Sequence, residues 1–555
     1  MRPECIGRVQ SEVAVAELSV GSADAEPARA TARLPDQVVG RILPGLAGLL
    51  IVWLSIRLTD FYYDHAWASA HFATIAQSFA GHGILGLGGI PIENFDPLTS
   101  QPDNYLHWPP LYFYALSLVQ RMFPESIRAM HLFMATIALA NAVVIRAIAA
   151  RFFNPRAAMV CGSAFLLMPA TLRYGLVLLP VNLAMLEVAL ALLSMLRSLQ
   201  GAEREKAASL GLGTLLFLLA CLTSWEAFLA LPGLLMAYGL DRRPEILRTG
   251  LCWTAAAIAA GAGTLSLYGL SDPTFFNDLW SIFTFRLGLT PYLPQPARIH
   301  PVEGQVEAID GVTVFYAHPT FNFFEAYVVR MQNFCGALGL IGLFALASTA
   351  LRRHRAGADD GLAALLLPLA TIWLGWAGLM QGHYIIHTYQ FVLATPLLAL
   401  GVGCLYALLD DTLMAARDLR ARQGLAIVKD LAIPAALLLS GMVAAATTLA
   451  GDPEAFDLAG FGRRIRAEVP AGAMVLTSEM SMVQTFYAQR HVIRGVPDGG
   501  YVEARLQTIQ DICPGCALYL ALRRANAAKF QGLLDRLPPL FEDDDYIIRK
   551  IEPLH

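Results

Sequence analysis

The sequence predicts a mainly α-helical membrane protein, a polytopic bundle with long outer loops and a small C-terminal soluble α/β domain. Hydrophobic residues occupy 56% of the 555 positions and charged residues only 15%, too few charges to solvate a globular protein of this length. Apolar runs recur that reach the roughly 17 to 25 residues a membrane helix needs, which predicts about eleven to thirteen spans. Clear examples are residues 130 to 150, 175 to 196, 251 to 270, 389 to 409 and 431 to 449.

The two ends of the chain differ from this apolar middle. Residues 1 to 38 are rich in Ala, Glu, Arg and Ser without an apolar run, so we expect a disordered cytoplasmic tail. Residues 39 to 451 form the predicted membrane domain. Residues 452 to 555 alternate short β-rich runs with helix-like stretches, which favours an α/β domain outside the cytoplasm. Its expected strands are residues 474 to 477, 491 to 496, 517 to 522 and 546 to 551.

The distribution of charge predicts the orientation in the membrane. The loop of residues 59 to 109 contains acidic residues but no lysine or arginine, and the loop of residues 271 to 333 is also acidic on balance. By the positive-inside rule both loops lie outside the cytoplasm. Short connections rich in basic residues mark the cytoplasmic turns, and they contain Arg242, Arg243, Arg248, Arg352, Arg353, Arg355, Arg417, Arg420, Arg422 and Lys429.

The number of crossings between the two outer loops must be even, yet seven apolar segments lie between Pro110 and Leu270. One of them is therefore not a full span. The weakest candidates are the short segment 110 to 123 and the closely spaced pair 210 to 222 and 228 to 240. The sequence does not decide among them.

The first outer loop contains a distinctive arrangement of polar residues. Asp60 and Asp64 follow the first span, with His65 directly before a helix-like run at residues 66 to 79. The chain re-enters the membrane at Tyr105-Leu106-His107-Trp108-Pro109-Pro110-Leu111. In order and spacing, residues 40 to 410 resemble the GT-C superfamily of glycosyltransferases. The nearest likenesses are protein O-mannosyltransferases, lipid A aminoarabinose transferases and lipopolysaccharide-core transferases.

The resemblance implies an enzyme that takes a sugar from a polyprenyl-phosphate donor and passes it to a lipid, glycan or protein acceptor. The transfer would occur at the outer face of a cell membrane, a bacterial inner membrane, among membrane lipids. It implies no cofactor. The family often has Asp-Glu where this chain has Asp64-His65. A flippase or other transporter of lipid-linked saccharides, and a saccharide ligase or polymerase, are the alternatives, although we find no internal repeat of the kind many transporters show.

Glycosyl transfer from a lipid phosphate needs a carboxylate base and cationic groups that hold the departing phosphate. Asp64 is the predicted base, with Asp60 as its alternative; Asp64 could instead be the N-cap of the helix at residue 66. For the phosphate we expect Arg286, which could instead be an interfacial arginine at the headgroups, together with His107 and His387. The predicted substrate-binding residues are His65, Asp103, Tyr105 and Tyr389.

Other classes of function and site find little support. The net charge of −4 and the lack of a basic tract argue against a nucleic-acid partner. The outer loops lack an Asp-x-Asp motif, so we predict a site without metal. Cys513 and Cys516 form a lone CxxC, which favours a disulfide or a plain loop over zinc. Glu187 and Glu226 are acidic residues within apolar segments, and function is one of two interpretations for them.

Overall fold

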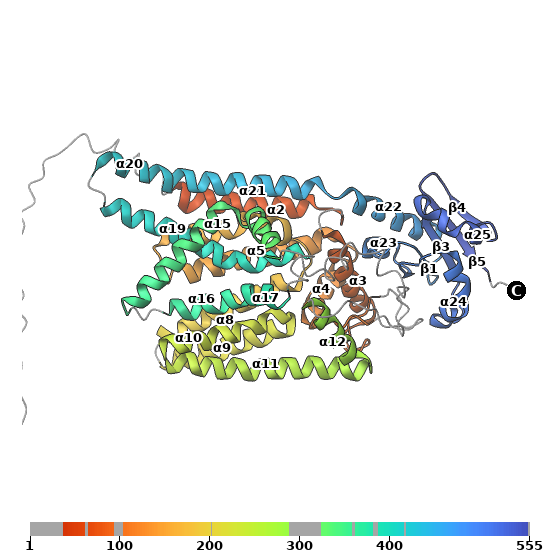
Figure 1. Cartoon of the computed structure of the whole chain (residues 1–555), viewed down its shortest axis with the longest axis horizontal. Helices are drawn as coiled ribbons and strands as arrows, with labels where there is room; N and C mark the ends of the chain where they lie inside the picture. Colours follow the sequence, from red (N-terminus) through yellow and green to blue (C-terminus); the bar gives the residue numbers. More distant parts are fainter. Residues whose placement is uncertain are drawn as a thin grey trace, which may run out of the picture.

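The computed structural model describes residues 37 to 61, 65 to 93, 104 to 200, 203 to 287, 323 to 357, 361 to 380, 387 to 415 and 418 to 552. It consists of a bundle of long helices with a smaller α/β domain at one end (Figure 1). Nearly all of the predicted tail, together with Asp64 and Asp103, lies outside the described residues. The backbone of Arg286 is described and its side chain is not.

Nine helical segments in the described ranges are long and apolar enough to cross a membrane. Several of their large apolar side chains are exposed, among them Leu49, Ile258 and Phe344 at 68%, 65% and 76%. Such faces need a lipid solvent, so the chain is a multi-pass membrane protein. The spans contain α2 (Leu43–Arg57), α5 (Ile127–Ala149), α8 (Pro180–Gln200), α9 (Glu203–Thr223), α11 (Pro244–Ser271), α15 (Phe323–Arg355), α16 (Leu362–Ala370) with α17 (Trp376–Leu379), α19 (Thr395–Ala415) and α21 (Ile433–Ala450).

Two shorter helices, α6 (Pro155–Leu167) and α10 (Ala230–Asp241), pack among these spans. Helices α15 and α19 approach closely where Gly342 meets Gly401, since a Cβ atom at Gly342 would lie 2.5 Å from the carbonyl carbon of Gly401. Small residues at such a crossing let two membrane helices make backbone contact.

Helix α4 (Leu111–Met122) explains the odd number of apolar segments. It has 12 residues and packs against α3 (Ala66–His82) at one end of the bundle (Figure 1). The chain leaves α4 beside Thr59 and Asp60, because Glu125 and Ser126 line the same hollow as these two residues. Helix α4 therefore begins and ends at one end of the bundle. Apart from the six-residue α7 (Pro169–Tyr174), six helices remain between residues 110 and 271 in this part of the structure, the even number that the two outer loops require: α5, α6, α8, α9, α10 and α11.

The arginine-rich turns gather at the end of the bundle opposite the α/β domain (Figure 1). They follow α10, α15 and α19, as the sequence predicts. One basic residue of this group, Lys429, is buried, and its Nζ lies 2.5 Å from Asp410 Oδ1. Tyr406 donates a hydrogen bond of 2.6 Å to Asp430 next to it. A buried ammonium group needs such partners to offset its loss of hydration, so this network fastens α19 to the start of α21.

The C-terminal domain is built on a five-stranded sheet with the order β2-β1-β3-β5-β4. Strands β1 (Met474–Leu476), β2 (His491–Ile493) and β3 (Leu518–Arg523) run parallel, whereas β4 (Pro539–Glu542) and β5 (Tyr546–Ile551) join by antiparallel pairing. The four predicted strands are confirmed: β5 has the predicted bounds, and the bounds of the other three differ by one to three residues. Strand β4, which starts with a proline at the sheet edge, was not predicted.

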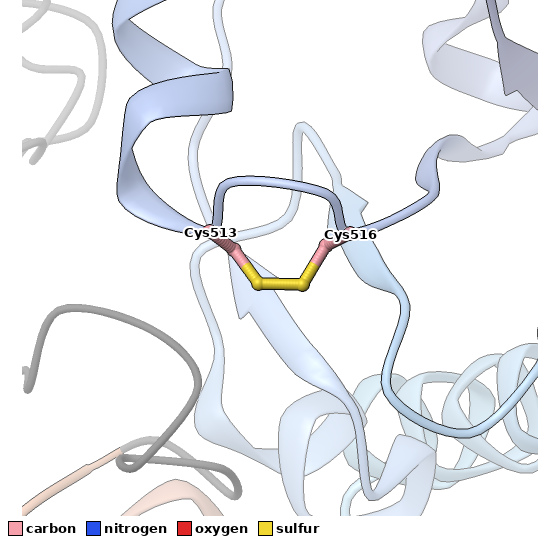
Figure 2. Close-up of a disulfide and its surroundings, with 2 residues drawn as sticks. All are labelled: Cys513 and Cys516. Atoms are coloured by element: carbon pink, nitrogen blue, oxygen red, sulfur yellow. A yellow bond between two sulfur atoms is a disulfide. The ribbon is translucent and has the colours of Figure 1, made fainter.

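Both faces of the sheet are covered by helices. Alternate residues of β1 and β3 enter two separate cores, one with Leu476 and Leu520 and the other with Val475 and Tyr519. Helix α24 (Gly499–Ile512) covers the first face and α22 (Pro453–Glu468) the second. A disulfide joins Cys513 and Cys516 in the turn between α24 and β3 (Figure 2), which agrees with one of the two interpretations favoured for this CxxC. The remaining elements of the domain are α23 (Met482–Ala488) and α25 (Gln531–Leu534).

The domain packs directly on the membrane bundle through α23, which lies against α3. The apolar core of the bundle continues into the domain at Met482, Val483 and Phe486. Ion pairs complete the contact, including Arg494 Nη2 to Glu93 Oε2 at 2.9 Å. The described parts of the first outer loop, namely α3, Asp60 and Glu93, therefore contact the C-terminal domain.

Candidate functional site

The start of α3 brings the residues around Asp64 to the end of the bundle. His65 takes the N-cap position of α3 in a left-handed conformation with φ 59°. Its carbonyl oxygen accepts hydrogen bonds from Ala68 and Ser69, while its side chain makes no capping bond. Since His65 occupies the cap position, the alternative role of Asp64 as N-cap loses support. The imidazole does not cap the helix and contacts other residues.

His65 belongs to a cluster of aromatic and polar side chains from three distant segments. Its Nε2 lies 2.8 Å from Thr388 Oγ1, which in turn lies 2.7 Å from the hydroxyl of Tyr174. The ring of Tyr389 stands edge-on to His65 at 5.3 Å, and His387 stacks on Tyr389 at 5.1 Å. Tyr174 and Tyr389 are almost fully buried, whereas His65 and His387 are partly accessible. The structure thus brings three predicted residues, His65, His387 and Tyr389, into one cluster.

A second set of predicted residues lies along the re-entry segment. His71 Nε2 is 2.8 Å from Glu93 Oε1, and the His71 ring contacts Tyr105 at 4.5 Å. The ring of Tyr105 contacts His107 at 4.9 Å. Tyr105 therefore stands between two imidazoles, one of them tied to an acidic residue. Because Glu93 also binds Arg494 of the C-terminal domain, this group connects the re-entry segment to the domain.

The connection between α9 and α10 contacts both sets of residues. It is formed by the short 3-10 helix η2 (Trp225–Leu229). Trp225 Nε1 donates a 2.8 Å hydrogen bond to the carbonyl oxygen of His107. Glu226, which is 1% exposed, accepts hydrogen bonds from Ser224 and, at 3.2 Å, from Gln390 Nε2. The connection between α9 and α10 thus contacts the His107 segment and the segment that contains His387 and Tyr389.

Asp60, the alternative base, already has two partners. Its Oδ1 accepts hydrogen bonds from Arg463 and, at 3.0 Å, from the Tyr487 hydroxyl. Burial raises the pKa of Tyr487, so this hydroxyl keeps its proton and remains a donor. The backbone N–H of Phe61 donates to the same hydroxyl at 2.9 Å. The environment of Asp60 therefore suits an anchor for the loop that leads to Asp64 better than it suits a base.

Besides the predicted Arg286, the structure places a second arginine, Arg173, beside the cluster. Arg286 ends α12 (Phe275–Arg286), whose start packs against the end of α11. Arg173 of α7 (Pro169–Tyr174) lies closer to the cluster, with its guanidinium 5.7 Å from the ring centre of Tyr174 and 5.4 Å from that of Phe334. Among the described residues, no group of three or more His, Cys, Asp or Glu side chains could hold a metal ion.

The fold matches solved structures over most of its length. ArnT from Cupriavidus metallidurans bound to undecaprenyl phosphate has a TM-score of 0.62 at 13% identity, covering 92% of this chain and 98% of that chain. The Archaeoglobus fulgidus oligosaccharyltransferase in the apo form has a TM-score of 0.56 at 13% identity, covering 87% and 69%. The chain has the GT-C fold. No protein-family model and no curated protein matches the sequence.

The GT-C fold confirms the family resemblance at the level of architecture, and at these identities it shows the fold alone. Three site residues were not found from the sequence: Arg173, Tyr174 and Thr388. Arg173 had a detectable signal, because it is an arginine between the apolar segments 157 to 168 and 176 to 181 and such residues are often functional. Tyr174 and Thr388 had none, since a tyrosine and a threonine are common in membrane helices.

Proposed function

We propose that the protein is a membrane glycosyltransferase that moves a sugar from a polyprenyl-phosphate donor to an acceptor hydroxyl at the outer face of the membrane. The observation that carries the proposal is the cluster of His65, Tyr174, His387, Thr388 and Tyr389 beside the segment of Asp64. Support comes from the GT-C fold, which is shared with an ArnT structure that contains undecaprenyl phosphate. The charge pattern, with arginine-rich turns at the other end of the bundle, supports the outer location.

The proposed reaction is a single displacement at the anomeric carbon. The acceptor oxygen forms a bond to this carbon as the bond between the carbon and the phosphate oxygen breaks. The polyprenyl phosphate leaves with the electron pair, and Asp64 takes the proton of the acceptor hydroxyl. Attack and departure occur on opposite faces of the sugar, so the configuration inverts.

Each predicted residue has a role in this proposal. Arg286 and Arg173 stabilise the negative charge of the departing phosphate, assisted by His107 and His387. His65, Tyr105 and Tyr389 contact the sugar through hydrogen bonds and ring faces, and Asp103 is proposed for the same task. The acceptor class, whether lipid, glycan or protein, follows from the experiment below.

The first prediction tests the base. Asp64→Asn keeps the size of the side chain but cannot accept a proton, so turnover should fall about 100- to 10,000-fold. The measurement is transfer from radiolabelled lipid-linked sugars in membranes, with donor binding and folding measured on the same preparations. The labelled product also identifies the acceptor.

The matched control is Asp60→Asn. Since Asn retains a carbonyl oxygen that can accept from Arg463 and Tyr487, we expect a smaller loss of transfer than in Asp64→Asn. The reverse order would move the base to Asp60. Full activity in both variants would rule out this mechanism, and vectorial movement of lipid-linked saccharide without transfer would favour a flippase.

A further inference from the structure

A hollow of about 510 Å³ lies where the C-terminal domain meets the membrane bundle. Its walls come from the end of α2, the start of α5, and helices α22 and α23. The charged side chains in these walls are three arginines and two carboxylates: Arg128, Arg463, Arg466, Asp60 and Glu125. None of the residues proposed for the transfer reaction lines it, apart from Asp60 in its role as an anchor.

Two of the three arginines share their charge with a carboxylate of the protein, for which an anion in the hollow would compete. Arg463 pairs with Asp60. Arg466 pairs with Glu125 through two hydrogen bonds of 2.9 and 3.3 Å. Partial burial opposes ionisation of Glu125, but hydrogen bonds from Arg466 and Gln489 outweigh it and lower the pKa of this carboxyl. Each carboxylate is therefore paired with one arginine. The third arginine gives the hollow a net positive charge.

Arg128 supplies this excess charge. It is exposed, and the described part of the chain gives it no hydrogen-bond or ion-pair partner. It lies in the first turn of α5, where a cation opposes the helix dipole. The stability of α5 therefore does not explain its position, whereas an anion in the hollow would.

The surroundings show which kind of anion fits. Span α2 ends at Arg57 and span α5 begins at Ile127, both next to the hollow. The hollow therefore opens at the level of the lipid headgroups. The end of α4, directly before the wall residue Glu125, has exposed apolar side chains. They are Leu118, Met122 and Phe123, with exposed fractions of 56%, 68% and 52%. Apolar side chains beside cationic ones at a membrane surface bind molecules that have both an acyl chain and an anionic group.

We propose that this hollow binds the phosphate group of a membrane lipid, with Arg128 and Arg466 as the phosphate ligands and the end of α4 against the acyl chains. The site joins the C-terminal domain to the membrane surface through a lipid. The proposal does not depend on the transfer reaction.

The test compares lipid retention by the full chain purified in detergent. Native mass spectrometry counts the phosphatidylglycerol or phosphatidylcholine molecules that remain bound after exchange into mixed micelles. Arg128→Gln should lower phosphatidylglycerol retention about fivefold, the effect of one basic residue at an anionic surface. Glu125→Gln should raise it, because Arg466 loses its competing partner.

The matched control is Arg57→Gln, since Arg57 is exposed at the same end of α2 but does not line the hollow. If only general surface charge mattered, Arg128→Gln and Arg57→Gln would lower lipid retention equally. That result would contradict the proposed site. A gain in Glu125→Gln cannot come from damaged folding and would support it. Titration with inorganic phosphate separates the sources: stabilisation by phosphate alone, with no displacement by phosphatidylglycerol, would overturn the lipid as occupant.

Discussion

At the scale of single residues, the possible role of each polar side chain in the site depends on the hydrogen-bond partners that it already has. Asp60 has Arg463 and Tyr487 as partners, and His65 has Thr388. The sequence singled out His387 and Tyr389 at a membrane entry point, and His65 because it stands where the family often has Glu. The structure brings these three residues together. It could not reveal that Thr388 and Tyr174 link them, since the two residues are 214 positions apart.

The cations that would hold the donor phosphate allow a prediction at this scale. Arg286→Ala and Arg173→Ala should each weaken donor binding about tenfold or more, because removing a charged hydrogen-bond donor costs about 1.5 to 3 kcal/mol. Binding of a labelled polyprenyl-phosphate sugar to the purified protein measures this. Arg505→Ala, in exposed helix α24 of the C-terminal domain, is the control and should bind the donor normally.

The pair also separates the two arginines. If Arg286→Ala binds the donor normally and Arg173→Ala does not, Arg286 is an interfacial arginine and the phosphate lies beside Tyr174. Normal binding in both variants would transfer the role to His107 and His387.

At the scale of elements, sequence patterns predicted most helices and strands, but not which of the seven apolar segments between residues 110 and 270 is not a full span. Apolar length predicts a span only when the segment enters and leaves at different ends, and α4 does not. Its 12 residues begin after Pro110 and return beside Thr59. Strand β4 escaped prediction for a different reason: Pro539 starts it, its residues are largely exposed, and a short edge strand has no alternating apolar pattern.

The connection η2 between α9 and α10 contacts both the His107 segment and, through Gln390, the segment of His387 and Tyr389. Replacing Glu226 by Ala would leave Gln390 and Ser224 buried without their acceptor, which costs about 1 to 3 kcal/mol. We expect a large loss of transfer activity in Glu226→Ala. Glu226→Gln keeps a carbonyl oxygen for Gln390 and should recover most of the activity.

Steady-state kinetics distinguish positioning from general instability. A positioning role predicts that Glu226→Ala lowers kcat more than it changes the KM for the donor, while the amount of folded protein in detergent stays near that of the parent. Equal loss in Glu226→Ala and Glu226→Gln would instead show that the carboxylate charge itself is required, and the positioning role would be wrong.

At the scale of the whole molecule, the first outer loop lies between two bodies that are far apart in the sequence. Asp60 and Arg463 are separated by 403 positions and Glu93 and Arg494 by 401. Each of these residues is an ordinary surface charge in the sequence, and only the packing of α23 on α3 brings them together. Charge patterns did predict the two ends of the bundle, because the positive-inside rule acts on whole loops and needs no contact information.

This contact suggests how the C-terminal domain serves the site. Its residues Arg463, Tyr487 and Arg494 bind the chain on both sides of Asp64, at Asp60 and Glu93. We therefore expect the domain, residues 452 to 555, to support and shape the site.

The arrangement of the two ends gives the last prediction. If the arginine-rich turns face the cytoplasm, a cysteine at Lys529 in the C-terminal domain should react with a membrane-impermeant maleimide in intact cells, and one at Arg355 after α15 should not. Both residues are exposed, so accessibility within the protein does not limit the reaction. The parent for both variants should have its free cysteines replaced by Ala and keep Cys513 and Cys516, which are joined in the disulfide. After permeabilisation both positions should react, which confirms that the Arg355 variant is folded and reactive. Labelling of Arg355→Cys alone from outside would invert the topology, and with it the proposal that Asp64 meets its donor at the outer face.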